Sequence, residues 1–273
     1  MIDIEQFLAV SNAHSPAFAA DGDRLAYLSD ETGTPQVWVT AGPEATPRRL
    51  TNVEGGVSFF SWSPTRNAVV FGADSEGDER VQLYRVSGDG GETTRLTDAP
   101  DAMHRWGGWS RDGDRFAFTA NRRSGHASDV FVYSIDGKSR CFHQTDGWFD
   151  VAGWGPNDDR LLLVEAHSNV RQDLHVLDLR TGERRQLTDG EGMRYASVNW
   201  GPDGDALYLV TDAHVGTRYV ARLDLGIRAL DPVVEGGDWN VEGVNVHPSG
   251  RVVYGRNVDG WSEVTVGDRK SVV

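Results

Sequence analysis

Lysine, cysteine and long apolar runs are scarce in this sequence, and each shortage argues against a class of protein. Only Lys138 and Lys270 among the 27 basic residues are lysines, and no basic stripe is present, which disfavours a DNA- or RNA-binding role. Cys141 is the single cysteine, so an intramolecular disulfide is excluded, and its neighbours Phe131 and Phe142 suggest a buried thiol rather than a nucleophile. No window approaches about 18 consecutive apolar residues, so no membrane-spanning helix is expected.

Acidic residues are in large excess. The 41 Asp and Glu residues against 27 basic ones give a net charge of −14. A dense shell of carboxylates with almost no lysine resembles proteins adapted to a high-salt cytoplasm, where salt screens the self-repulsion; the alternative is an acidic, soluble protein without that adaptation. The N-terminal stretch MIDIEQFLAV has two acids, no base and no long apolar run, so a signal peptide is not expected and the expected location is cytoplasmic.

One motif recurs six times along the chain. It has the form WSRDGDRFAFTAN, in which an anchor residue leads into a turn and then into an alternating strand. The copies begin at Phe18, Trp62, Trp109, Trp154, Trp200 and Val246. Successive anchors lie 44, 47, 45, 46 and 46 residues apart, and a fixed period of this length indicates a repeat architecture.

Each repeat has the same internal order. An apolar stretch enters the anchor, a Pro or Asp-Gly turn follows, and then come an alternating strand, a polar loop, a third strand and a Gly-containing hairpin into a fourth. Four strands in about 45 residues are typical of a β-propeller blade. The sequence therefore predicts an all-β fold, a propeller of about six four-stranded blades, with the anchor tryptophans packed between neighbouring blades.

The ends of the chain differ from the repeats. Residues 1–13 are expected to form an N-terminal segment, in which Ile4, Phe7 and Leu8 have the spacing of a short amphipathic helix, and residues 14–273 the propeller. The first blade is expected to start in its innermost strand, and the outer strand of the sixth to be short or missing.

The repeats resemble those of known propellers. The segments WGPDGDALYLVTD and GTRYVARLDL, with siblings such as GGETTRLTD, are similar to TolB-like, WD-type repeats. They are equally similar to the N-terminal propeller of the prolyl oligopeptidase family, in its acylaminoacyl-peptidase and dipeptidyl-peptidase branch, whose start the opening DIEQFLAVSNAHSPAFAADGDRLAYLSD resembles. The resemblance covers nearly the whole chain and is specific for fold rather than for function.

The resemblance implies a second, catalytic domain that this chain lacks. In that peptidase family the propeller precedes an α/β-hydrolase domain whose serine lies on a Gly-x-Ser-x-Gly elbow. The nearest matches here, around Ser110 and Ser262, lack the final glycine. We therefore expect no catalytic residue in this chain and no enzyme activity of its own, although an association with serine peptidases is implied.

A propeller binds ligands where its innermost strands open onto the axial channel. Counting back from each anchor gives the candidate ligand-binding residues at that mouth: His14, His104, Arg105, Trp148, Asp150, Arg194, Tyr195 and Glu242. Arginines beside carboxylates are suited to hold the two ends of a peptide. The alternative is that these are solvated loop charges on an acidic protein.

No cofactor and no metal site are expected. The acidic loop Asp74–Glu79 does not match a calcium-binding loop and is better explained as a solvated hairpin tip. His167 and His175 lie eight apart across a hairpin, but two histidines without a third ligand are weak evidence for a metal. The glycine-rich stretch Gly88–Gly91 closes a hairpin and has no following helix, which excludes a nucleotide site there.

Three functions are compatible with these observations. The leading one is the non-catalytic propeller portion of a prolyl-oligopeptidase-family serine peptidase, which gates peptide access and docks to a hydrolase domain. The second is a stand-alone TolB-like protein-binding scaffold. The least favoured is a propeller enzyme with its own channel-mouth site, for which His14, Asp150 and Glu242 would be the only seeds. The expected partners are a hydrolase domain or another protein, and peptides, but neither nucleic acid nor membrane.

Overall fold

The computed structural model describes residues 10–75, 77–188, 193–213 and 216–268. These residues form six antiparallel sheets in which strands pair in chain order, as expected for propeller blades. The first three blades contain β1 (Ala13–Phe18), β2 (Leu25–Ser29), β3 (Gln36–Thr40), β4 (Arg48–Arg49); β5 (Val57–Trp62), β6 (Ala68–Ala73), β7 (Gln82–Ser87), β8 (Thr94–Arg95); and β9 (His104–Trp109), β10 (Arg115–Ser124), β11 (Ala127–Ser134), β12 (Lys138–His143). The last three contain β13 (Phe149–Trp154), β14 (Arg160–Ser168), β15 (Arg171–Asp178), β16 (Arg184–Gln186); β17 (Tyr195–Trp200), β18 (Ala206–Thr211), β19 (Tyr219–Asp224), β20 (Leu230–Val234); and β21 (Val241–Val246), β22 (Arg251–Val258), β23 (Trp261–Asp268).

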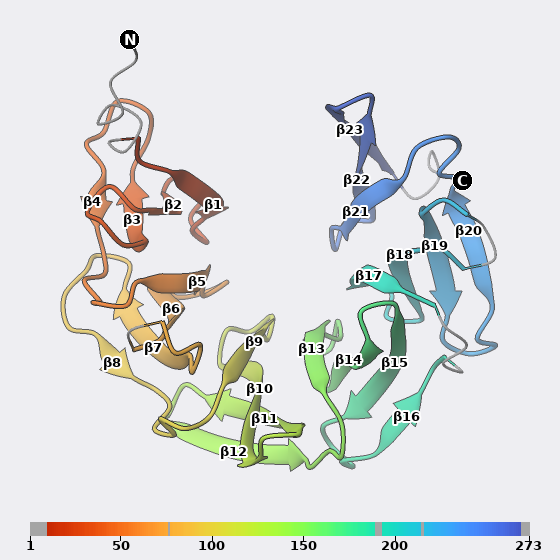
Figure 1. Ribbon diagram of the computed structural model, residues 1–273, viewed down its shortest axis with the longest axis horizontal. Helices are drawn as coiled ribbons and strands as arrows, with labels where there is room; N and C mark the ends of the chain where they lie inside the picture. The colour runs from red at the N-terminus through yellow and green to blue at the C-terminus, as the bar shows by residue number, and fades with distance from the viewer. Residues whose placement is uncertain (1–9, 76, 189–192, 214–215, 269–273) are drawn as a thin grey trace.

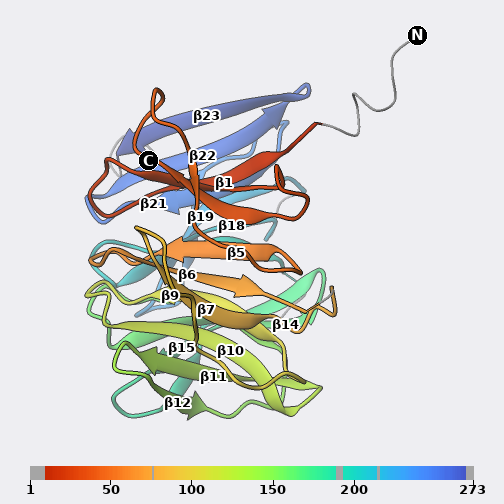
Figure 2. The ribbon, with the colours of Figure 1, turned by 90° about the vertical axis from the view of Figure 1, so that its left-hand side faces the viewer.

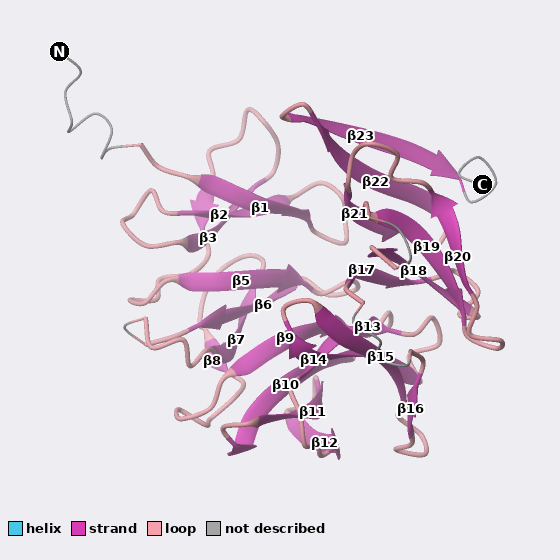
Figure 3. Ribbon diagram, turned by 45° about the vertical axis from the view of Figure 1, so that its right-hand side comes forward, coloured by secondary structure: helices cyan, strands magenta, loops and turns pink. Residues whose placement is uncertain are grey.

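The blades are arranged around a central axis. Figure 1 shows β1, β5, β9, β13, β17 and β21 innermost, with the later strands of each blade farther out. Seen from the side, β5 and β6 run across the thickness of the ring (Figure 2). The described part of the chain contains only strands and loops (Figure 3), so no helix in it could cross a membrane. The predicted all-β, six-bladed propeller is confirmed.

Every anchor of the repeat is the last residue of an innermost strand. Trp62 and Trp154 are buried there, and each packs against apolar residues of the preceding blade. Trp62 joins Ala26 and Val39 of the first blade, and Trp154 joins Ala117 of the third. The anchors therefore have the predicted role of filling the space between blades, which a single sheet could not bury alone.

A polar clip explains the Leu-Thr motif that ends the fourth strand. The Thr51 hydroxyl donates to Gln36 Oε1 over 2.9 Å and accepts the backbone N–H of Val37 over 2.9 Å. Thr97 makes the same two bonds, to Gln82 Oε1 over 3.1 Å and from the Leu83 N–H over 2.9 Å. The clip ties the end of each outer strand to the start of the third strand and satisfies a buried backbone N–H.

The ring is open between its first and last blades (Figure 1). Phe18, the anchor of the first blade, is 68% exposed, because no blade formed by the described residues covers the side that Trp62 buries in the next repeat. On the sixth blade, Val253, Val264 and Val266 share one face of the sheet and are exposed. That blade has three strands among the described residues, which confirms the expectation for its outer strand.

Two expectations concern the N-terminus. Among the described residues, the first blade begins with its innermost strand, β1, at Ala13, and the boundary expected at residue 14 stays a prediction. The amphipathic helix expected around Ile4, Phe7 and Leu8 lies outside the described residues.

Candidate functional site

A hollow of about 410 Å³ lies where the second, third and fourth blades approach the channel. The repeat itself brings its charged residues together, because Arg105 and Asp150 each stand four residues before an anchor, on the neighbouring inner strands β9 and β13. The hollow is lined by Phe59, Val81, His104, Arg105, Trp106 and Asp150. It combines an aromatic wall with one ion pair, which is the usual composition of a small binding site.

Arg105 and Asp150 form the ion pair of this hollow. Arg105 Nε lies 3.1 Å from Asp150 Oδ1, but this oxygen is buried and has no aligned hydrogen bond, so the contact is ionic. Burial raises the pKa of Asp150, and the charge of Arg105 acts in the opposite direction. The Arg105 guanidinium also lies 5.9 Å from the ring centre of Trp148, within range of a cation–π contact.

His104 has a fixed structural environment. It is buried, its Nδ1 donates to the Val81 carbonyl over 2.8 Å, and its Nε2 accepts from Arg122 Nε over 3.1 Å. Burial is the main reason that its pKa is lowered to about 4, and the Arg122 charge adds to the effect. His104 is therefore neutral at pH 7, with both ring nitrogens engaged, and acts as a wall of the hollow rather than as a charged contact.

The other four candidate residues lie elsewhere on the rim. His14 is exposed on β1 and contacts the Ser15 hydroxyl over 3.0 Å, and Glu242 is exposed on β21. Arg194 is exposed, whereas Tyr195 is buried and its hydroxyl donates to Met193 Sδ over 3.4 Å. The structure thus brings His104, Arg105, Trp148 and Asp150 together and leaves His14, Arg194, Tyr195 and Glu242 apart from them. His14, Asp150 and Glu242, the residues considered for a channel-mouth enzyme, come from three separate blades.

Sequence reasoning missed the apolar wall of the hollow. Phe59 and Trp106 each stand three residues before an anchor, and their rings lie 5.8 Å apart across the junction of the second and third blades. The same count that selected Arg105, moved on by one residue, would have found them.

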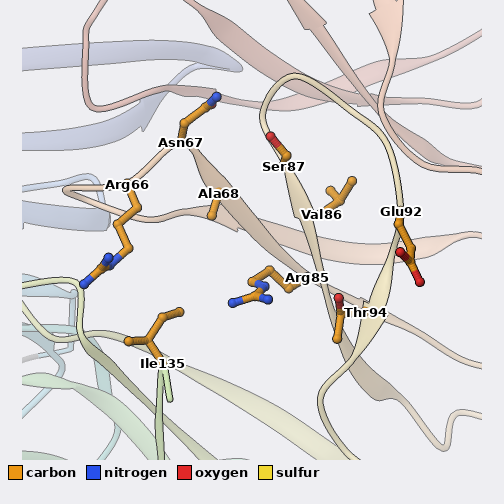
Figure 4. A pocket seen from close by; sticks show the side chains of 9 residues that line it. All are labelled: Arg66, Asn67, Ala68, Arg85, Val86, Ser87, Glu92, Thr94 and Ile135. Carbon is orange, nitrogen blue, oxygen red and sulfur yellow. The ribbon is translucent and has the colours of Figure 1, made fainter. Parts of the chain in front are cut away.

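A second hollow, of about 340 Å³, lies between the outer parts of the second and third blades. Figure 4 shows Arg66 and Arg85 near Ile135, with Glu92 and Thr94 on the opposite side. Arg66 is already paired with Asp114. This hollow is away from the innermost strands, so the channel-side hollow is the better candidate site.

The sequence matches known peptidases. Residues 5–106 match the family model described as the dipeptidyl peptidase IV (DPP IV) N-terminal region. The uncharacterized peptidase YuxL of Bacillus subtilis is 26% identical over 210 residues, covering 75% of this chain and 30% of the relative. Dipeptidyl-peptidase 5 of Porphyromonas gingivalis is 24% identical over 254 residues, covering 73% of this chain and 37% of the relative.

The chain resembles a peptidase propeller. It spans about a third of the length of the curated relatives that it matches, 30% of one and 37% of the other. The resemblance inferred from the repeats is confirmed, and the part of such proteins that this chain resembles is the propeller.

Solved structures show the same fold. A prolyl endopeptidase structure superposes with a TM-score of 0.75 at 16% identity, covering 95% of this chain and 42% of the other. TolB from Acinetobacter baumannii superposes with a TM-score of 0.57 at 21% identity, covering 80% of this chain and 53% of the other. The putative TolB from Agrobacterium tumefaciens superposes with a TM-score of 0.61 at 20% identity, covering 82% of this chain and 80% of the other. At these identities the likeness establishes the propeller fold alone.

The electrostatics of the hollow lead to a first prediction. Changing Arg105 to Gln is expected to raise the pKa of Asp150 further, because burial then acts on the carboxyl without the opposing charge. Carboxyl-carbon NMR titration of Asp150 measures the shift. Arg194→Gln, which removes a rim arginine without touching Asp150, is the matched control. An unchanged Asp150 titration in Arg105→Gln would contradict the pairing.

Proposed function

We propose that this chain is the non-catalytic propeller portion of a prolyl-oligopeptidase-family serine peptidase, in which it gates peptide access and docks to a hydrolase domain. The observation that carries the proposal is the match of residues 5–106 to the dipeptidyl peptidase IV N-terminal region. It is supported by two relatives named as peptidases, in each of which the aligned part is about a third of the protein.

The gating role rests on the channel-side hollow. A short peptide has a carboxylate that Arg105 can pair with and an amino group that Asp150 can pair with. The Asp150 side chain as a whole is 36% exposed, so an arriving amino group can approach its carboxylate. Phe59 and Trp106 provide apolar surface for side chains. The proposed gate therefore favours short peptides that bring a free carboxylate or a free amino group to this ion pair.

The chemistry in this proposal belongs to another domain. Ser110, in the nearest approach to an elbow, is buried in the turn after β9, where its hydroxyl donates to Asp112 Oδ1 over 2.6 Å. This is the geometry of a blade turn and not of the strand-to-helix elbow that exposes a nucleophile. The propeller would position and select peptides, and the hydrolase domain would cleave them.

A second candidate is a stand-alone TolB-like scaffold that binds a protein partner. The observation that favours it is coverage, since the chain accounts for 80% of the Agrobacterium tumefaciens TolB chain but only 42% of the prolyl endopeptidase. The exposed face of the sixth blade offers apolar surface for such a partner.

Reading the coding DNA downstream of the codon for Val273 separates the two candidates. The peptidase proposal predicts that it encodes an α/β-hydrolase with a Gly-x-Ser-x-Gly elbow. In the full-length protein, Arg105→Gln would then raise the KM for short peptides about tenfold, by loss of one charged contact, with Arg194→Gln as the matched control. A stop codon followed by unrelated sequence would contradict the proposal and favour the scaffold.

A further inference from the structure

The hairpin of β14 and β15 carries two histidines and two carboxylates on one face. Side chains alternate along a strand, so Glu165 and His167 share a face of β14, and Asp173 and His175 share a face of β15. Glu165 stands directly opposite Asp173 in the register, and His175 lies one alternation farther along. Pairing of the two strands brings the Glu-x-His segment of β14 and the Asp-x-His segment of β15 side by side. In the sequence alone, only the two histidines had stood out.

Three of these side chains, Glu165, His167 and Asp173, place one ligand atom each within 4.8 Å of the other two, and His175 lies against Glu165. His167 Nε2 lies 2.9 Å from Asp173 Oδ2, and His175 Nε2 lies 2.9 Å from Glu165 Oε2. Glu165 Oε2 and His167 Nε2 are 4.0 Å apart. Around a tetrahedral Zn²⁺ with bonds of about 2.0–2.1 Å, ligand atoms are separated by roughly 3.3–3.4 Å. The observed separations bracket that value, so small side-chain rotations suffice to enclose an ion.

Comparison with the other blades shows that this charge is not needed for the fold. Asp173 Oδ1 accepts the Thr188 hydroxyl over 2.9 Å, which is the polar clip described above. The first and second blades make that clip with the neutral residues Gln36 and Gln82. The fourth blade therefore has a carboxylate where an amide is enough, and its second oxygen faces His167.

The third blade uses a carboxylate differently. There Asp129 is paired with Arg123 through two contacts, of 2.9 and 3.1 Å. In the fourth blade the residue at the same distance before the carboxylate is His167, and Glu165 adds a second negative charge. Two carboxylates facing two imidazoles match the charge of a divalent cation, whereas one carboxylate facing a guanidinium needs none.

His175 supports the site from its buried side. Its side chain is 2% exposed, and its Nε2 lies 2.9 Å from Glu165 Oε2. A ring that carries its proton on Nε2 donates to this carboxylate and holds it beside His167, as the hydrogen-bond partners of metal-binding carboxylates do.

We propose that Glu165, His167 and Asp173 form a Zn²⁺ site, with His175 hydrogen-bonded to Glu165 behind it. The imidazole ligand favours zinc over Ca²⁺ and Mg²⁺, which take oxygen ligands. Three protein ligands leave the fourth tetrahedral position to water. The His167 side chain is 33% exposed and gives the ion a route from solvent. The ion would fasten β14 to β15 where their register shifts, between Ala166 and Ser168.

Zinc titration of the full chain tests the site. Protein without a histidine tag is stripped with a chelator and titrated with Zn²⁺ by calorimetry, and one ion per chain is expected. His167→Ala and Glu165→Gln are each expected to weaken binding at least about 100-fold. His126→Ala is the matched control, because His126 is an exposed histidine on the corresponding hairpin of the third blade, and it should bind as the wild type does.

Two further readouts separate this site from adventitious binding to an acidic surface. Co²⁺ bound in place of Zn²⁺ should give the intense visible absorption of a tetrahedral complex in the wild type and in His126→Ala, but not in His167→Ala. Zn²⁺ should raise the melting temperature of the same two proteins only. Equal zinc affinity in the wild type and His167→Ala, or equal competition by Ca²⁺, would overturn the proposal.

Discussion

Replacing Trp62 by alanine is expected to lower the free energy of unfolding by about 3–5 kcal/mol, whereas Phe18→Ala is expected to cost less than about 1 kcal/mol. Both residues end an innermost strand and begin the same repeat motif. Trp62 is 7% exposed, lies 5.4 Å from the Arg24 guanidinium and packs so closely on Gly88 that a β-carbon there would be 2.6 Å from the ring. Phe18 is 68% exposed, and no blade in the described part of the chain lies against it.

Urea denaturation of the two variants beside the wild type, at one pH and one salt concentration, measures the difference. Phe18→Ala is the matched control for Trp62→Ala, because the repeat position is the same and only the neighbouring blade differs. Equal losses at the two positions would mean that the face of the first blade is covered in solution, and would contradict the open ring.

Acidification is expected to destabilise the protein through His104. Its folded-state pKa of about 4 lies below the ordinary value of 6.5, because burial disfavours the charged ring. Between these two values the unfolded chain binds a proton that the folded chain does not, so stability falls as pH falls. The contribution of neutral His104 to the free energy of unfolding is fully present above pH 6.5, and about 3 kcal/mol of it is lost by pH 4.

The control for this prediction is His104→Gln, which keeps an acceptor for Arg122 but does not titrate. The free energy of unfolding of the wild type and the variant is measured from pH 7.5 to pH 4 at constant ionic strength. The difference between the two curves should change by about 3 kcal/mol across that window, which removes the contributions of the many carboxylates. Parallel curves would show that His104 titrates normally in the folded state.

The fold was predictable because the repeat is encoded locally. Each anchor is the end of an innermost strand, so counting from Trp62 or Trp154 located the blades and the axial rim without any knowledge of the structure. The same counting placed Arg105 and Asp150 together, since neighbouring blades present equivalent positions side by side. A periodic architecture turns sequence spacing directly into spatial adjacency.

The parts of the site that the sequence did not predict depend on packing between blades. His104 and Tyr195 lie beside rim residues in sequence but are buried, because their side chains point into the sheet junctions. Glu165 and Asp173 were not recognised as neighbours of His167 and His175, because that requires the register of β14 on β15. A register shift of one residue would place them on opposite faces, and the sequence around Ser168 does not fix it.

The open ring also has a consequence for self-association. Each blade packs one of its faces against the opposite face of the next blade. The uncovered face of the sixth blade is therefore suited to pack against the uncovered face of a first blade. Contact between two copies through these faces would be heterologous, and each addition would leave a new pair of ends, as in a filament. The net charge of −14 opposes such growth by repulsion. Added salt weakens that repulsion and strengthens apolar contacts. High salt, which suits so acidic a surface, is therefore also the condition that most favours association through the uncovered ends.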